Sequence, residues 1–164
     1  VLFRSTTSSE NVEWVKELGA DTVIDYKKQD YKTIVKDIDM VLDTLGNQYT
    51  EDAFTVIKNG GKVITLVGIV DKETSNRMKL NKIAQLFLAW KRRKITKQIQ
   101  LKSAYYSLLL MRANAKQLNE ITKLVESGKI KTRIDKVFSL NEVLDALLYL
   151  KNGRTKGKVV IKIK

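Results

Sequence analysis

The sequence contains no cysteine and no histidine. The absence of cysteine excludes disulfides, and the two absences together exclude the Cys and His ligand sets that hold zinc. They also exclude a thiol nucleophile and a serine activated by histidine. Any chemistry of this chain must therefore use a bound cofactor. A chain without cysteine suits a reducing compartment, and the first residues lack the pattern of a secretory signal, so we expect a cytoplasmic protein.

Long apolar runs are also missing. Runs such as Leu86–Trp90 and Leu108–Met111 are far shorter than the roughly 20 residues of a membrane-spanning helix. With 164 residues, of which 43% are hydrophobic, the chain can bury one ordinary core and a piece of another. The composition therefore predicts a globular protein with no membrane span.

Acidic residues are missing from two basic stretches. Residues 77–102 hold nine Lys and Arg, residues 151–164 hold six, and neither stretch holds an acid. The rest of the chain is close to neutral, so these stretches account for the net charge of +13. Such a stretch can bind nucleic acid or an anionic membrane, but more often it is the solvated face of a helix, and we favour that interpretation.

Short continuous apolar segments alternate with segments that have the apolar spacing of helices. The predicted strands are 22–26, 39–44, 62–67, 134–138 and 157–161, with a further strand-forming segment at 98–111. The predicted helices are 7–18, 50–58, 78–94, 116–127 and 139–151. This alternation, with strands that are continuously apolar, predicts a parallel sheet covered by helices on both faces.

Polar residues at the starts of helices support these boundaries. Thr7 and Glu10 have the spacing of a capping box, and Ser8 or Ser9 could cap the same helix instead. Thr50 is the predicted N-cap of the second helix. A second capping box opens the last predicted helix. The helices are thus predicted from their ends as well as from their apolar spacing.

Six ordered segments resemble the C-terminal part of the medium-chain dehydrogenase/reductase superfamily, especially its quinone-oxidoreductase-like members. They are LGADTVIDY, DMVLDTLGN, NGGKVITLVG, LVESGKI, IDKVFSLNEVLDALLYL and GRTKGKVVIKI. Each segment alone is a common type of sequence, but their shared order makes the match specific. The resemblance covers nearly the whole chain after Thr6.

The resemblance implies a division into domains. Members of the family carry a GroES-like catalytic domain, then a nucleotide-binding domain, and the tail of the chain returns to the catalytic domain. Residues 6–127 are accordingly expected to form a Rossmann domain from its second strand onward, and residues 128–164 the returning catalytic piece. We interpret residues 1–5, VLFRS, as an assembly artefact, because a common sequencing adapter translates to them in one reading frame.

The glycine-rich turn GxGxxG, which brings backbone amides to the pyrophosphate of a dinucleotide, does not occur in this sequence. The substrate-facing residues of the catalytic domain are not found either, so the sequence names no catalytic residue. We therefore expect the chain to hold a cofactor weakly and to be inactive alone. One alternative is that it is part of a broken gene and has no function of its own.

The resemblance implies an NADP-dependent oxidoreductase, with NAD as the alternative cofactor. The reaction would be hydride transfer to an activated double bond, quinone or carbonyl of a small-molecule substrate, without zinc. Relatives commonly dimerise through the edge strand of the sheet, so a homodimer is expected and a nucleic-acid partner is not. The alternative function is a non-enzymatic module that binds nucleic acid or an anionic membrane through residues 77–102.

By resemblance, the turn after the second strand of the Rossmann sheet binds the adenosine 2′-phosphate. The candidates there are Ser8, Ser9 and Asn11, joined by Tyr26 at the end of the next strand. No acid stands where an NAD-specific carboxylate would hold the ribose, but Glu10 occupies a place that is often basic in relatives, which leaves the NADP preference open. The alternative is that the serines only cap a helix and the tyrosine only packs.

A dinucleotide lies across the carboxyl ends of the strands of such a sheet. The candidates at these ends are Thr44, Leu45, Gly68 and Ile69. Gly68 would permit close approach of the backbone, although it could equally be an ordinary turn glycine. The resemblance adds a loop that reaches the nicotinamide side, at Leu110, Met111 and Arg112.

Overall fold

The computed structural model describes residues 2–153 and 155–163. Val1 of the interpreted artefact, and Arg154 and Lys164 of the second basic stretch, lie outside the described residues. The chain divides into two compact units, Val1–Met111 and Arg112–Lys164, and each is described by itself.

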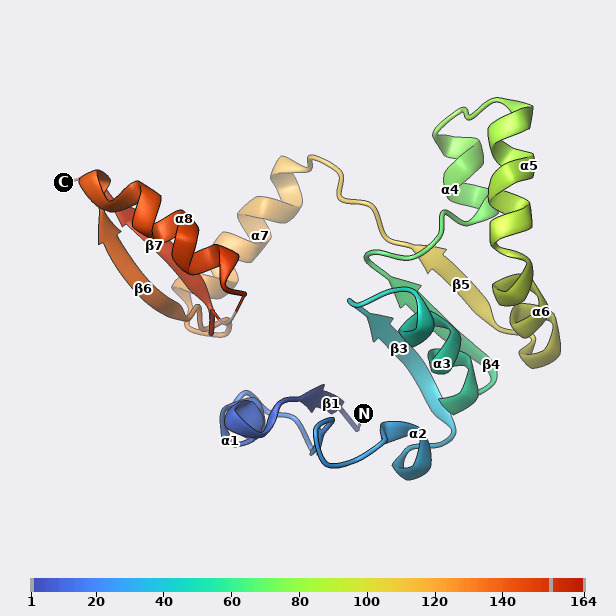
Figure 1. The fold of residues 1–164 in the computed structure, drawn as a ribbon, viewed down its shortest axis with the longest axis horizontal. Coiled ribbons are helices and arrows are strands. Elements are labelled where there is room, and N and C mark those ends of the chain that lie inside the picture. The colour runs from blue at the N-terminus through green and yellow to red at the C-terminus, as the bar shows by residue number, and fades with distance from the viewer. Residues whose placement is uncertain (1, 154, 164) are drawn as a thin grey trace. The chain divides into compact units, whose positions relative to one another are not determined.

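The strands of the first unit are all paired in parallel (Figure 1). They are β1 (Arg4–Thr7), β2 (Thr22–Asp25), β3 (Ile38–Asp43), β4 (Ile57–Thr65) and β5 (Tyr105–Leu108). The helices are η1 (Ser9–Asn11), α1 (Val12–Glu17), α2 (Tyr31–Ile34), α3 (Gln48–Val56), α4 (Lys72–Arg77), α5 (Lys82–Lys91) and α6 (Arg93–Lys102). Parallel neighbours require crossover connections, which these helices supply, and the predicted α/β class with parallel strands is confirmed.

These strands form two sheets among the described residues. One contains β1 and β2, and the other has the order β3, β4, β5. The described strands show no pairing between β1 and β3, so each of these two strands leaves one backbone edge unpaired within the described part of the chain.

The second unit is a smaller α/β arrangement (Figure 1). Its elements are α7 (Ala115–Glu126), β6 (Ile134–Ser139), η2 (Leu140–Glu142), α8 (Val143–Lys151) and β7 (Lys158–Lys162). β6 and β7 are parallel, and α8 lies between them in the chain. The second predicted capping box is confirmed, because the backbone N–H and the hydroxyl of Ser139 donate to Glu142 Oε2 at 2.8 and 2.7 Å.

The largest core cluster lies where α3 and α6 cover one face of the three-stranded sheet. Phe54 from α3 and Val63 from β4 are fully buried in it, together with Ile95 from α6. The ring of Phe54 lies 6.3 Å from that of Tyr106 on β5. This one cluster therefore fixes two helices and two strands relative to one another.

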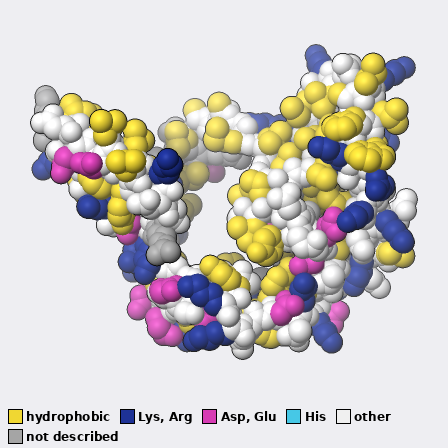
Figure 2. Space-filling model, viewed as in Figure 1, with side chains coloured by type: hydrophobic (Ala, Val, Ile, Leu, Met, Phe, Trp, Pro, Cys, Tyr) yellow, Lys and Arg dark blue, Asp and Glu magenta, His cyan; other side chains and the backbone are white. Residues whose placement is uncertain are grey.

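Apolar side chains also remain on the surface (Figure 2). Met40 and Leu42 of β3 are exposed, whereas Val41 between them packs against the core. Successive side chains of a strand point to opposite faces, so β3 is apolar on both. This is the pattern of a strand that belongs inside a sheet covered on both faces.

Most predicted boundaries agree with the structure. The strands predicted at 22–26, 39–44, 134–138 and 157–161, and the helix predicted at 116–127, are each confirmed to within about a residue. The predicted capping box of Thr7 and Glu10 is wrong, because Thr7 lies in β1. β1 itself was not predicted, since its sequence RSTT has no apolar pattern.

Thr50 is not an N-cap but lies inside α3, whose N-cap position is Asn47. The physical reason is that the Thr50 hydroxyl donates to the buried Asp43 carboxylate, which draws the start of the helix toward the end of β3. The helix also ends two residues before the predicted residue 58, and β4 begins at Ile57.

The region 78–111 was partly misassigned. The predicted helix 78–94 is interrupted: α5 begins after Asn81, whose side chain caps it by accepting from the Ala84 N–H at 2.8 Å, and a new helix starts at Arg93. Residues 98–102, predicted within a strand-forming segment, belong to α6 because Ile95 and Ile99 pack against the core at helical spacing.

Replacement of Phe54 by alanine should lower the free energy of unfolding of the chain by about 3–5 kcal/mol, because it leaves a cavity in the main core. Urea unfolding followed by circular dichroism measures the change. Tyr49→Ala on the exposed side of the same helix is the control, and it should cost less than about 1 kcal/mol. Equal losses in the two variants would contradict the assignment of the core.

Candidate functional site

The first group of predicted cofactor residues gathers at the carboxyl ends of β1 and β2. The strands are parallel, with Thr7 opposite Asp25, and the Tyr26 N–H donates to the Thr7 carbonyl at 3.1 Å. Ser8 and Ser9 begin directly after β1, so the structure brings them to the same edge as Tyr26. Tyr26 is exposed there.

Hydrogen bonds orient the polar side chains of this edge. Ser9 Oγ donates to Asp25 Oδ2 at 2.6 Å, and Asn11 Nδ2 donates to Ser8 Oγ at 3.2 Å. The Ser9 hydroxyl, followed by other donors, holds the pKa of the Asp25 carboxyl below its usual value despite partial burial. Within the described residues Ser8 makes no side-chain cap to the helix, and Asn11 Oδ1 is buried without a hydrogen-bond partner.

The same edge holds a lysine that the sequence analysis missed. Lys27 Nζ lies 2.7 Å from Glu10 Oε1, and this hydrogen bond is the main reason that the pKa of Glu10 is lowered to about 2. Glu10 therefore already pairs with the Lys27 ammonium group, which would otherwise be free to attract an anionic ligand. The two lysines at 27–28, after the predicted strand 22–26, were the signal in the sequence for a cation at this edge. The contact of Lys27 with Glu10 could not be predicted from local sequence, because the two residues are 17 positions apart.

A buried carboxylate organises the second group, at the end of β3. Asp43 Oδ1 accepts the backbone N–H groups of Leu45 and Gly46, both at 2.9 Å. Asp43 Oδ2 accepts the hydroxyls of Thr50 and Thr65, the latter at 3.0 Å. Burial by itself raises the pKa of Asp43, but these hydrogen bonds outweigh it and the net pKa lies below the usual value.

This carboxylate fixes the turn that carries Thr44 and Leu45, and both side chains remain exposed. In the predicted strand 39–44, Asp43 had no role of its own. An aspartate between an apolar strand and a glycine is the signature of a side chain that accepts from the turn after it, and that signal could have identified it.

Gly68 packs against the protein's own side chains. A Cβ at this position would lie 2.5 Å from Thr65 Cγ2 and 2.7 Å from Tyr106 Oη. The Tyr106 hydroxyl donates to the Ile69 carbonyl at 2.6 Å, so it holds the segment that follows β4. Desolvation is the main reason that the pKa of Tyr106 is raised, and the hydroxyl stays a donor at ordinary pH.

The three strand ends of the larger sheet meet at one edge. Asp43 lies opposite Thr65, and Thr65 lies opposite Leu108. The Leu109 N–H donates to the Thr65 carbonyl at 2.8 Å, which brings the start of the predicted nicotinamide loop beside β4. Met111 is 96% exposed. Arg112 begins the second unit, so it is not described together with the others.

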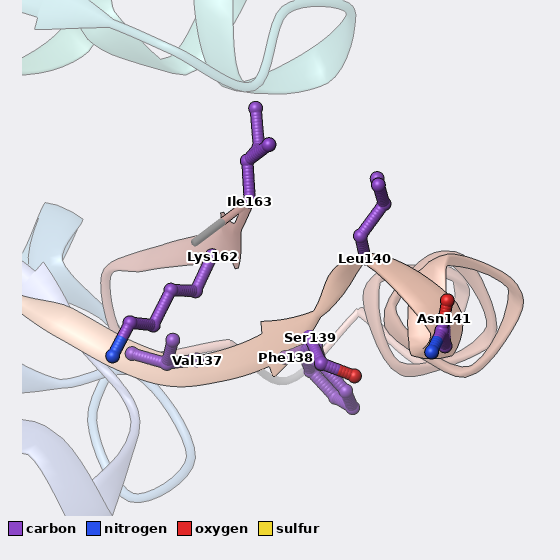
Figure 3. Close-up of a pocket in the computed structure, with 7 residues that line it drawn as sticks. All are labelled: Val137, Phe138, Ser139, Leu140, Asn141, Lys162 and Ile163. Atoms are coloured by element: carbon purple, nitrogen blue, oxygen red, sulfur yellow. The ribbon is translucent and has the colours of Figure 1, made fainter.

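An open pocket of about 420 Å³ lies in the second unit (Figure 3). Its lining residues are Val137, Phe138, Ser139, Leu140, Asn141, Lys162 and Ile163. The predicted cofactor residues lie in other parts of the sequence, so this pocket gives them no support. Among the described residues, no group of three or more carboxylates could hold a metal ion, and no helix is long and apolar enough to cross a membrane.

Sequence comparison gives one family match over most of the chain. The profile of the family described as zinc-binding dehydrogenase matches residues 18–161. A 2-methylene-furan-3-one reductase from Solanum lycopersicum is 31% identical over 159 residues, and an NADPH-dependent alkenal/one oxidoreductase, chloroplastic, from Arabidopsis thaliana is 29% identical over the same length. Each alignment covers 96% of this chain and 32% of the relative, so the chain spans about a third of these proteins.

Solved structures share the fold. A quinone oxidoreductase from Coxiella burnetii superimposes with a TM-score of 0.74 at 24% sequence identity, over 99% of this chain and 45% of that one. An NAD-dependent alcohol dehydrogenase superimposes with a TM-score of 0.73 at 22% identity, over 99% of this chain and 44% of that one. At this level of identity the likeness concerns the arrangement of the chain.

Gly68→Ala should lower the free energy of unfolding by about 1–3 kcal/mol, because the added methyl group has no room beside Thr65 and Tyr106. In a double-mutant cycle with Thr65→Ala, the combined loss should be smaller than the sum of the two single losses, since removing the threonine side chain relieves part of the clash. Denaturant unfolding of the four proteins gives the coupling. If the two single losses simply added in the double variant, the close approach of Thr65 to Gly68 would be contradicted.

The Glu10–Lys27 pair predicts an unusually acidic glutamate. Its stabilisation is present above the ordinary Glu pKa of 4.5 and is lost as the pH falls toward about 2, because the folded-state pKa is the lower one. NMR titration of the Glu10 carboxyl should give a midpoint of about 2 and a higher one in Lys27→Met. Lys28→Met is the matched control and should leave the Glu10 midpoint in place; a shift of equal size there would argue against a specific pair.

Proposed function

Since this chain belongs to the zinc-binding dehydrogenase family of medium-chain dehydrogenase/reductases, we propose that it is the C-terminal part of an NADP-dependent oxidoreductase. The proposed reaction is hydride transfer to an activated double bond, quinone or carbonyl of a small molecule. The activities for which two relatives are named support this class, because one is an NADPH-dependent alkenal/one oxidoreductase and the other a 2-methylene-furan-3-one reductase. The chain by itself is proposed to be inactive.

The order of the strands is the observation that carries the proposal. The classic dinucleotide-binding sheet has the strand order 3-2-1-4-5-6. The described sheets have the orders β2, β1 and β3, β4, β5, which correspond to 3-2 and 4-5-6 with strand 1 left out. A parallel strand between β1 and β3 would join the two sheets. We propose that an upstream segment supplies this strand and the glycine-rich turn after it.

The proposed cofactor site follows the carboxyl edge of the completed sheet. Ser8, Ser9, Asn11 and Tyr26 would face the adenosine end. The buried Asn11 Oδ1 lacks a partner among the described residues, so this side chain would gain a hydrogen bond by turning toward a bound ligand. The remaining proposed contacts are Thr44, Leu45, Gly68, Ile69, Leu110, Met111 and Arg112.

When bound, the nicotinamide ring supplies the hydride, and the protein supplies its position and surroundings. In this chain the positioning falls to the turns that Asp43 and Tyr106 hold in place. A zinc ion does not fit the residues present, because the sequence has neither Cys nor His. We therefore propose no step through a metal in this part of the protein.

Three further proposals rest on the family. Residues 6–127 would belong to the Rossmann domain and residues 128–164 to the catalytic domain, and a homodimer would form through the edge strand β5. Light scattering of a protein that includes the upstream strand tests the dimer. A cytoplasmic location is likewise proposed, although the names of several relatives place them in chloroplasts or mitochondria, and fluorescence microscopy of the tagged protein decides it.

Glu10→Lys should raise the preference for NADPH over NADH by about tenfold, because it releases Lys27 and adds a cation beside the proposed 2′-phosphate site. Fluorescence titration of a longer protein with the upstream strand restored measures both affinities. Glu13→Lys makes the same change of charge at an exposed position nearby and should alter the preference by less than about threefold.

The two parts of the proposal fail differently in this titration. Binding of neither nucleotide by the unaltered longer protein would overturn the oxidoreductase assignment. Binding that responds equally to Glu10→Lys and Glu13→Lys would keep the oxidoreductase but reject the phosphate site at the end of β1.

A further inference from the structure

The outward face of α5 is apolar. Its exposed side chains are Ile83, Leu86, Phe87 and Trp90, with exposed fractions of 82, 74, 53 and 60%. Their spacing of three, one and three residues places them on one side of a helix, where they form a continuous stripe. A helix on the surface of a globular protein normally presents its polar side to water, whereas α5 presents its apolar side.

The opposite face of the helix attaches it to the protein. Ala84 and Leu88 are half-buried, and just beyond the helix Arg92 Nη1 donates to the Val70 carbonyl at 2.6 Å. The helix is thus held by its less apolar side, and the apolar stripe is left on the surface of the first unit. Figure 2 shows hydrophobic side chains intermixed with Lys and Arg in the region of α5.

Basic side chains border the stripe. At 100° per residue, Lys82 and Lys91 project on opposite sides of it. Lys91 Nζ lies 4.9 Å from the centre of the Phe87 ring, and Arg93 Cζ lies 5.0 Å from that of Trp90. The cations are therefore next to the apolar stripe and not on the far side of the helix.

We propose that α5 docks on an anionic lipid surface, with its apolar stripe among the acyl chains and its basic border on the headgroups. Aliphatic and aromatic side chains flanked by Lys and Arg form the pattern of helices that lie in a membrane interface. The proposal is independent of the cofactor site and goes beyond the oxidoreductase function.

The charge around the stripe favours lipid over the other occupants. Residues 77–102 hold nine basic residues and no acid, so two copies that met through this face would place like charges together. Nucleic acid would use the cations, since its phosphates dominate such binding, but it has no use for Ile83 and Leu86. Lys94 is not counted in the basic border, because its Nζ pairs with Glu51 Oε2 at 3.6 Å.

Sedimentation with vesicles tests the proposal on the 164-residue chain. One set is phosphatidylcholine alone, and the other contains about 30% phosphatidylserine at about 0.15 M salt, where long-range attraction is screened. Binding is expected to the anionic vesicles only. In a Trp14→Phe background Trp90 is the one remaining tryptophan, and its emission should move to shorter wavelength on binding.

Three variants separate the stripe from charge in general. Leu86→Ser with Trp90→Ser removes apolar side chains, and Lys82→Glu with Lys91→Glu and Arg93→Glu reverses the border; each should weaken partitioning by about tenfold or more. The matched control, Lys116→Glu with Lys123→Glu and Lys129→Glu in the second unit, makes the same change in net charge and should cost less than about threefold. Circular dichroism verifies that each variant is folded.

Several results would overturn the proposal. They are absence of binding to the anionic vesicles, equal losses in the control and border variants, and full binding after removal of Leu86 and Trp90. Light scattering adds one more: a dimer that dissociates when the stripe is removed, without vesicle binding, would assign the face to a second copy. Loss of binding in a longer protein with the upstream segment would show that this segment covers α5.

Discussion

The carboxylate of Asp43 is the interaction on which the edge of the larger sheet depends. It accepts two backbone amides of the turn after β3, one hydroxyl from α3 and one from β4. A buried charge is costly unless its hydrogen bonds are all made, so these elements have to assemble together. Thr65, one of its donors, also packs against Gly68, and so does the Tyr106 hydroxyl. The ends of three strands are thereby held in one connected arrangement.

The same device recurs at two other places. Asp25 ends β2 and accepts the Lys27 N–H of the following turn, and Asp71 accepts the Leu108 N–H of β5 as well as the Thr74 N–H of α4. In each case a carboxylate at the end of a strand or the start of a helix fixes the backbone beside the proposed cofactor edge. The exposed side chains there, such as Thr44 and Tyr26, can vary without loss of this support.

The sequence predicted what local patterns encode. The strand at 39–44 is predictable because its centre, Met40–Leu42, is continuously apolar. The start of the last helix is predictable from its capping box. β1 was not visible, since only its pairing with Thr22–Asp25 makes RSTT a strand. Residues 98–102 have a strand-like composition but belong to α6, because Ile99 packs against the core. The ion pair of Glu10 with Lys27 was likewise not predictable, because Glu10 follows β1 and Lys27 follows β2, and only the pairing of these strands brings them together.

The spacing of the strands along the chain also orders their assembly. Arg4 pairs with Thr22 and Val41 with Val63, separations of 18 and 22 residues, whereas Val63 pairs with Tyr106 across 43. Closing a longer loop costs more entropy, and α4, α5 and α6 have to find their places within this one. We therefore expect β5 to dock last. Because Tyr106 restrains the Ile69 carbonyl, the backbone after β4 would acquire its final conformation only in the closing step of folding.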